Sequence, residues 1–146
     1  MIRLINMLFV VLFSVSAHAI DLKSVRSSAD QDSSRVVLEF SGKPQFSHFN
    51  LNNPSRLVLD ITNLRTKTLS FLDSVDDSRI QRIRSSLRGN GRRLVFDLSG
   101  EYRSNVFTLG PKGRYPHRLV VDVVGYVAGE KVSARSAPLN ETAEPL

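Results

Sequence analysis

The chain repeats its own sequence pattern at an offset of 58 residues. The repeat consists of four aligned blocks: LKSVRSSA (22–29) with IQRIRSSL (80–87), RVVLEFSG (35–42) with RLVFDLSG (93–100), Phe49 and Leu51 with Phe107 and Leu109 and, after four extra residues, RLVLDI (56–61) with RLVVDV (118–123). Ordered recurrence in separate blocks indicates an internal duplication. The fold must therefore be one that two related units can build together.

Each block alternates apolar and polar residues with a period of two, which is typical of a half-buried strand. Segments rich in Gly, Pro and Asn (41–44, 52–55, 89–91 and 110–113) separate the blocks and predict turns. Each half then forms about four short antiparallel strands with one apolar face. We expect one sheet per half, and an all-β fold in which two related, mainly antiparallel sheets pack as a β-sandwich. Residues 69–78 break the strand rhythm, and we expect a turn of helix there.

Residues 1–19 have the pattern of a cleavable secretory signal peptide. Arg3 precedes an apolar run that ends at the small-residue site Ala17-His18-Ala19. The run is shorter than the roughly 20 apolar residues of a membrane-spanning helix, so we expect no stable membrane insertion. There is no twin-arginine pair and no cysteine. These features predict Sec-type export to the periplasm of a chain that begins at Ile20 and has no disulfide or lipid-modified cysteine.

The predicted mature chain has one domain, residues 20–125, with half-repeats at 20–61 and 78–123. Residues 126–146 have no aromatic side chain except Tyr126, and we expect a flexible tail or linker there. Removal of the signal peptide changes the formal net charge from +6 to +5. A basic exported protein is expected to bind anionic partners of the cell envelope rather than nucleic acid.

The paired RLVLDI and RLVVDV blocks, the two half-repeats and the signal peptide together resemble the AMIN domain. The resemblance covers Ile20 to about Val124. AMIN domains are N-terminal targeting modules of periplasmic N-acetylmuramoyl-L-alanine amidases and also occur in pilus secretins. The resemblance implies a noncatalytic periplasmic β-sandwich that binds peptidoglycan and is linked to cell-wall remodelling at the division site, with division-site or envelope-assembly proteins as further partners.

No catalytic constellation is evident in the chain. His48 aligns with Val106, and His117 falls in the four-residue insertion, so neither histidine belongs to a repeated site. There is no H-E-x-x-H motif, no cysteine and no G-x-S-x-G motif. We therefore expect no enzymatic activity, no metal and no cofactor.

Charged residues on the outward faces of the repeated strands predict a structural charge ladder. The expected pairs are Arg35 with Asp60, Glu39 with Arg56, Arg93 with Asp122 and Asp97 with Arg118. Cross-strand pairs of opposite charge each contribute roughly 0.2–1 kcal/mol.

The segment 79–93 holds six arginines and no acid, whereas the matching segment 21–35 holds three acids. Arginine presents a planar fork of donors that fits carboxylate or phosphate. We predict peptidoglycan binding there, with Tyr102 and Tyr115 as the candidate aromatic contacts. The predicted site residues are Arg82, Arg84, Arg88, Arg92, Tyr102 and Tyr115. The alternative for the arginines is a solvated loop.

Two alternatives to an independent targeting module remain open. The chain could be the N-terminal targeting part of a zinc N-acetylmuramoyl-L-alanine amidase whose catalytic domain is missing from this chain. It could also be a secretin-type envelope-assembly adaptor that uses the same fold to bind the wall and a partner protein.

Overall fold

The computed structural model describes residues 18–66 and 69–125. Most of the predicted signal peptide and all of the predicted tail, residues 126–146, lie outside the described residues. The elements are β1 (Leu22–Ala29), β2 (Ser33–Phe40), β3 (Gln45–Leu51), β4 (Arg56–Thr62), the 3₁₀ helix η1 (Ser70–Ser74), β5 (Ile80–Arg88), β6 (Gly91–Leu98), β7 (Tyr102–Leu109) and β8 (His117–Gly125).

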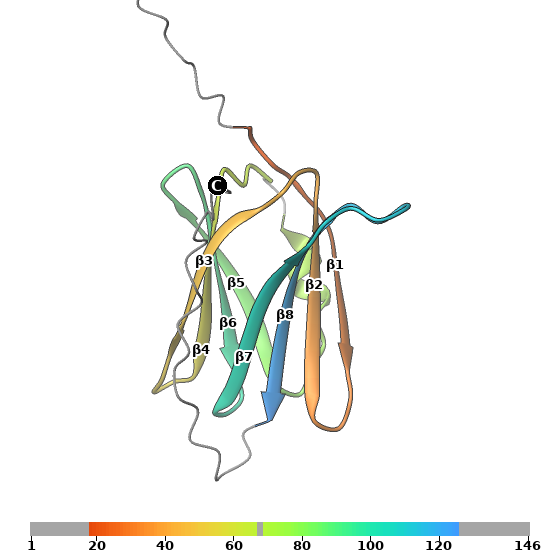
Figure 1. The fold of residues 1–146 in the computed structure, drawn as a ribbon. Coiled ribbons are helices and arrows are strands. Elements are labelled where there is room, and N and C mark those ends of the chain that lie inside the picture. Colours follow the sequence, from red (N-terminus) through yellow and green to blue (C-terminus); the bar gives the residue numbers. More distant parts are fainter. Residues whose placement is uncertain (1–17, 67–68, 126–146) are drawn as a thin grey trace, which may run out of the picture.

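The strands form two four-stranded antiparallel sheets that face each other (Figure 1). One sheet has the order β1-β2-β8-β7 and the other the order β3-β4-β6-β5. The predicted all-β sandwich of two related sheets is thus confirmed. The duplication relates the two sheets, because β1, β2, β8 and β7 of one sheet correspond to β5, β6, β4 and β3 of the other, which is the same order read from the opposite edge.

The prediction that each half would form its own sheet is wrong. Each sheet takes one hairpin from each half: β2 pairs with β8, and β4 pairs with β6. The chain changes sheet after β2 and again after β6, so the hairpins of one half lie in different sheets. The inner edge of each hairpin is completed by the other half, which satisfies its backbone hydrogen-bonding groups.

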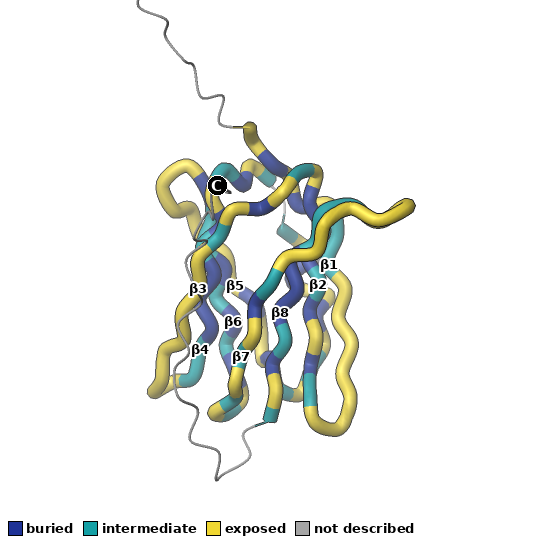
Figure 2. Tube along the Cα trace, in the orientation of Figure 1, coloured by how far each residue is buried: buried dark blue, intermediate teal, exposed yellow. Residues whose placement is uncertain are grey.

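The core lies between the sheets (Figure 2) and is made mainly of apolar residues at alternating strand positions, as the period-two pattern predicts. Val36, Leu38 and Phe40 of β2 face the interior with no exposed surface, and Leu94 and Phe96 of β6 do the same. Full burial of such side chains contributes roughly 1.5–3 kcal/mol each. Both halves therefore supply equivalent side chains to a single core.

The segment between the halves contains η1, which confirms the predicted turn of helix. It packs beside the edge strands β1 and β5, and its Leu72 is buried in the core. Within the described part of the chain, no helix is long and apolar enough to span a bilayer.

A buried polar contact fastens this connecting segment to β2. Ser34, which is 1% exposed, donates a hydrogen bond from Oγ to Asp77 Oδ1 at 2.8 Å. Arg79 donates from Nη1 to Ser34 Oγ at 3.1 Å and to the carbonyl of Asp30 at 3.1 Å. Arg79, the first arginine of the 79–93 segment, therefore has a structural role.

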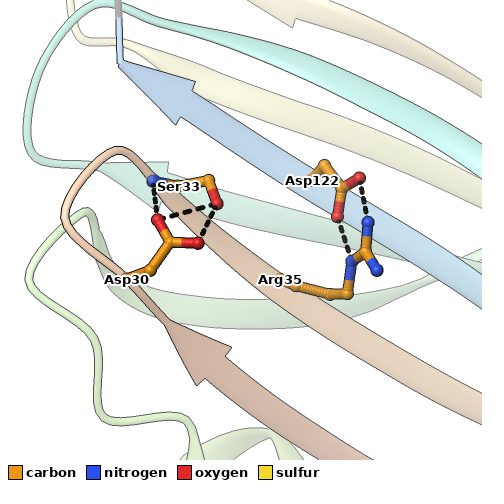
Figure 3. A network of polar contacts seen from close by, with 4 residues as sticks. All are labelled: Asp30, Ser33, Arg35 and Asp122. Atoms are coloured by element: carbon orange, nitrogen blue, oxygen red, sulfur yellow. Dashed lines mark hydrogen bonds and ion pairs between the residues drawn. The ribbon is translucent and has the colours of Figure 1, made fainter.

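The β1–β2 turn is closed by Asp30, whose carboxylate accepts hydrogen bonds from the backbone and side chain of Ser33 (Figure 3). In the equivalent β5–β6 turn, Gly89 has a φ of 56°, in the left-handed region that favours glycine. Gly91, which starts β6, lies so close to β4 that an added Cβ would be 2.0 Å from the carbonyl oxygen of Ile61. Only glycine fits at position 91.

Candidate ligand-binding site

The charged residues of the predicted ladder lie on the outer faces of the sheets, but the predicted partners are wrong. Arg35 forms a bidentate pair with Asp122, through Nε at 2.7 Å and Nη2 at 2.8 Å (Figure 3). Arg93 forms the same pair with Asp60, at 2.7 and 2.8 Å. The partners differ from the prediction because each sheet combines strands from both halves.

The other four ladder residues face each other in the register without forming ion pairs. Glu39 lies opposite Arg118, and Asp97 lies opposite Arg56. Both acids instead bind arginines of the edge strands. Asp97 accepts hydrogen bonds from Arg82 Nε at 2.6 Å and from Arg84 Nη2 at 2.7 Å.

Glu39 is bound in the same way on the other sheet. It pairs with Arg26 and accepts a hydrogen bond from Ser24 Oγ at 2.7 Å. Ser24 and Arg82 are the nearest equivalents on the two sheets, since each lies opposite the acid in the register.

The arginines keep the acids of this surface ionised. The hydrogen bond from Arg84, followed by the one from Arg82, lowers the pKa of Asp97 to about 2, although partial burial acts in the opposite direction. The hydrogen bond from Arg93 lowers the pKa of Asp60. Hydrogen bonding to Asp97 raises the pKa of Arg84. These groups are therefore all charged at neutral pH.

Three arginines line a groove on the outer face of β3-β4-β6-β5. The groove has a volume of about 420 Å³, and we call it the arginine groove; it is lined by Pro54, Ser55, Arg56, Gln81, Arg82, Arg84, Asp97 and Leu98. Three cations against one carboxylate give a local excess of positive charge. The Arg82 side chain is 68% exposed, so it can reach a ligand while Nε stays on Asp97.

A second cavity adjoins the arginine groove at the end of β3. It has a volume of about 260 Å³, and we call it the tyrosine pocket; it is lined by Asn50, Leu51, Asn52, Ser55, Arg56, Leu98, Glu101, Tyr102 and Arg103. Three residues, Ser55, Arg56 and Leu98, line both cavities. The Tyr102 hydroxyl lies 3.2 Å from Ser99 Oγ, which itself donates to the carbonyl of Ser78.

Arg56 is the residue that sequence reasoning missed, since we predicted a purely structural role for it. Its Nε donates to the carbonyl of Pro54 at 3.3 Å, and it forms no ion pair with any residue in the described ranges. The signal was its place in the repeated RLVLDI block directly after the turn 52–55. In that position Arg56 lies between Asp97, with its bound arginines Arg82 and Arg84, and Tyr102.

The structure brings together only some of the predicted site residues. Arg82 and Arg84 line the arginine groove, and Tyr102 lies in the adjoining pocket. Arg88 lies at the other end of β5, 3.8 Å from Asp60. Arg92 pairs with Leu87 and Ile61 in the register, so it projects to the opposite side of the sheet from Arg82 and Arg84.

Tyr115 is also distant from Tyr102 along the sheet. Tyr102 starts β7 opposite Gly125, whereas Tyr115 follows the other end of β7, in the loop before β8. The Arg118 guanidinium carbon lies 5.2 Å from the centre of the Tyr115 ring.

The described ranges contain no group of three or more His, Cys, Asp or Glu side chains that could hold a metal ion. His48 lies on the edge strand β3, where its ring stacks on Phe46 at a centroid distance of 6.1 Å. His117 begins β8. The lining of the two cavities includes four arginines, three amide side chains and the carboxylates of Asp97 and Glu101.

The structure defines the class of this protein as a duplicated β-sandwich module with an arginine-lined groove on one outer face. The family model of the AMIN domain matches residues 24–123, and the chain belongs to this family. The resemblance inferred from the repeated blocks is confirmed.

Two curated relatives share the domain. A protein of Neisseria meningitidis serogroup B named N-acetylmuramoyl-L-alanine amidase AmiC is 39% identical over 94 residues, covering 61% of this chain and 23% of the relative. A protein of Escherichia coli O6:H1 with the same name is 31% identical over 94 residues, covering 61% of this chain and 22% of the relative. The match therefore spans less than a quarter of either relative.

Proposed function

We propose that this domain is a noncatalytic module that binds peptidoglycan in the periplasm and directs cell-wall remodelling to the division site. The observation that carries the proposal is the position of Arg56, which lines both the arginine groove and the tyrosine pocket. Membership of the AMIN family and two relatives named as amidases of muramoyl-L-alanine bonds support it.

The two cavities fit different parts of a wall fragment. The arginine groove presents guanidinium groups to carboxylates of the peptide stem, because charge-assisted hydrogen bonds to carboxylate are the strong ones. The tyrosine pocket presents the Tyr102 ring together with the amides of Asn50 and Asn52, which suit the apolar faces and hydroxyl or amide groups of sugars. A single ligand that spans both cavities would contact Arg56 at their junction.

Retention of the exported protein on purified sacculi tests the proposal. We expect wild-type protein to sediment with sacculi, and the double variant Arg56→Gln, Arg82→Gln to bind more weakly by on the order of tenfold or more. Arg65→Gln is the control, because Arg65 is exposed and lines neither cavity. Melting temperatures of all three proteins establish that they are folded. Wild-type protein that stays in the supernatant would refute the proposed function.

A second candidate function follows from the names of the relatives. The domain would then be the N-terminal targeting part of a zinc amidase, and the catalytic domain would be encoded beyond Leu146. Reading the gene past this codon distinguishes the two arrangements. Release of peptide from sacculi by the 146-residue protein itself would contradict the noncatalytic assignment.

Export and position in the cell are tested separately from binding. Mass spectrometry of protein recovered from the periplasm should show a mature N-terminus at Ile20, and an intact Met1 would contradict cleavage. A fluorescent fusion should collect at the division site, and its uniform distribution around the cell would argue against a division role.

A further inference from the structure

The duplication gives the arginine groove a counterpart on the opposite sheet. Arg84, Asp97 and Arg56 of one sheet correspond to Arg26, Glu39 and Arg118 of the other. The registers agree, since Arg56 lies opposite Asp97 as Arg118 lies opposite Glu39. The domain therefore carries two copies of one arrangement of charges.

The local contacts of the two copies also match. Arg84 pairs with Asp97, and Arg26 pairs with Glu39. In each copy the remaining arginine binds a carbonyl in the loop of its own hairpin: Arg56 donates to Pro54, and Arg118 donates to Gly110 at 3.1 Å.

The copies differ in the loop that adjoins them. Residues 52–55 join β3 to β4, whereas the corresponding segment before Arg118, residues 110–117, is four residues longer. From this longer loop the Tyr115 ring lies against three arginines: its centre is 5.7 Å from the guanidinium carbon of Arg26, 5.2 Å from that of Arg118 and 5.4 Å from that of Arg114. Tyr115 is 37% exposed, so part of its side chain stays accessible to solvent beside the arginines.

We propose that the Tyr115 side chain takes the place of a ligand in the copy formed by Arg26, Glu39 and Arg118, which we call the closed copy. The copy formed by Arg84, Asp97 and Arg56, which we call the open copy, is then the single ligand site of the domain. This inference rests on the proposed function and assigns its stoichiometry and ligand chemistry. Tyr115 stacks on Arg26 and Arg118, whose equivalents Arg84 and Arg56 line the open groove. In the open copy Arg84 binds Asp97 through Nε and Nη2, and Arg56 binds the Pro54 carbonyl through Nε. Their remaining N–H donors and the faces of their guanidinium groups are the parts that a ligand can contact.

The second difference between the copies indicates the charge of the ligand. Arg82 stands in the open copy where Ser24 stands in the closed one. The open groove combines three arginines with one acid. In the closed copy Arg26, Arg118 and the loop residue Arg114 all lie against the Tyr115 ring. The positive charge that no ring covers in the open groove suits a ligand that carries negative charge. The geometry points to a wall peptide with free carboxylates.

Calorimetric titration of the exported protein with the soluble disaccharide-tetrapeptide that a muramidase releases from sacculi tests this. We expect one ligand per wild-type domain. Arg56→Gln should weaken binding by on the order of tenfold, because it removes a charge-assisted contact. The matched control is Arg118→Gln, the equivalent change in the closed copy, which should leave affinity and stoichiometry unchanged.

Opening the closed copy is the decisive step. Tyr115→Ala should raise the stoichiometry from one ligand to two, and Tyr115→Ala with Ser24→Arg should strengthen the second site. Amide NMR shifts of β1, β2 and β8 should respond to ligand only in these variants, and the same spectra establish that the variants are folded.

Three results would overturn the inference. They are two ligands on the wild-type domain, a Tyr115→Ala domain that still binds one, and wild-type protein that binds sacculi but not the soluble fragment. Each leaves retention of wild-type protein on sacculi intact, so failure of this inference is distinguishable from failure of the proposed function.

Discussion

Arg35 and Asp122 stand 87 positions apart in the chain, yet they form a bidentate ion pair across the centre of one sheet, with distances of 2.7 and 2.8 Å. The contact joins β2 of the first half to β8 of the second. Arg93 and Asp60 repeat it on the other sheet.

Charge reversal tests this pairing. Asp122→Arg should lower the free energy of unfolding by roughly 1 kcal/mol, because it places like charges opposite each other. Adding Arg35→Asp should restore part of the loss in a urea titration, whereas adding Arg93→Asp should not. Rescue by Arg93→Asp instead would mean that the strands pair within each half.

Gly91→Ala should destabilise the fold by more than about 2 kcal/mol, since the added Cβ meets backbone atoms of Ile61 and Thr62 that cannot move independently. Gly110→Ala is the control, because nothing lies within 4 Å of a Cβ placed there. Thermal unfolding of both variants checks the comparison. Equal melting temperatures would show that β4 and β6 are farther apart than described.

Ser34→Ala should cost about 1–3 kcal/mol, because it removes a buried hydroxyl that joins Asp77 to Arg79. Ser28→Ala, at an exposed position on β1, should change the unfolding free energy by less than about 0.5 kcal/mol. Chemical denaturation measures both. A neutral Ser34→Ala would contradict a role for this contact in fastening the connecting segment.

Stability should fall in acid because of Asp97. Its pKa is about 2 in the folded protein and ordinarily 3.8, so the unfolded state takes up the proton first as the pH falls. The contribution of ionised Asp97 to the free energy of unfolding is complete above about pH 5 and is lost as the pH falls through 2. Its magnitude is on the order of 1 kcal/mol. Asp97→Asn should therefore be less stable than wild type at pH 7 and approach it near pH 2. Parallel pH curves for the two proteins would contradict this.

Retention on sacculi should weaken as salt is added, because the arginines of the groove are exposed and screening acts over about 8 Å at physiological ionic strength. The single variants Arg84→Ser and Arg88→Ser, each measured at low and high salt, distinguish the contribution of the groove to retention from that of the rest of β5. Of these two arginines, only Arg84 lines the groove. If retention does not respond to salt, the tyrosine pocket rather than the arginine groove provides most of the binding.

The sequence was sufficient to predict the strands and their buried faces, because period-two alternation and turn residues are local signals. Leu38, Leu57 and Leu94 are all buried, as the alternation predicts. The partners of the strands were not predictable in this way. RLVLDI of β4 and RLVVDV of β8 carry the same charges at the same positions, so β2 could pair with either by the charge rule.

The site was only partly predictable for a related reason. Arg82 and Arg84 stood out by composition, but composition does not reveal that both bind Asp97. Arg92 has the same residue type and lies on the other side of the sheet, which only the register reveals. Arg56 lacked any compositional signal, and its role depends on the three-dimensional position of Tyr102.

Since β2 lies against β8 and β4 against β6, neither half-repeat contains a complete sheet. A chain cut between β4 and β5 would yield two fragments, each with two hairpins that have no partner along their inner edges. Such fragments can complete their sheets only by interlocking, either with each other or with a second copy of themselves. The domain thus has the architecture of an intertwined homodimer whose subunits have been fused head to tail, and it lends itself to split-protein reassembly.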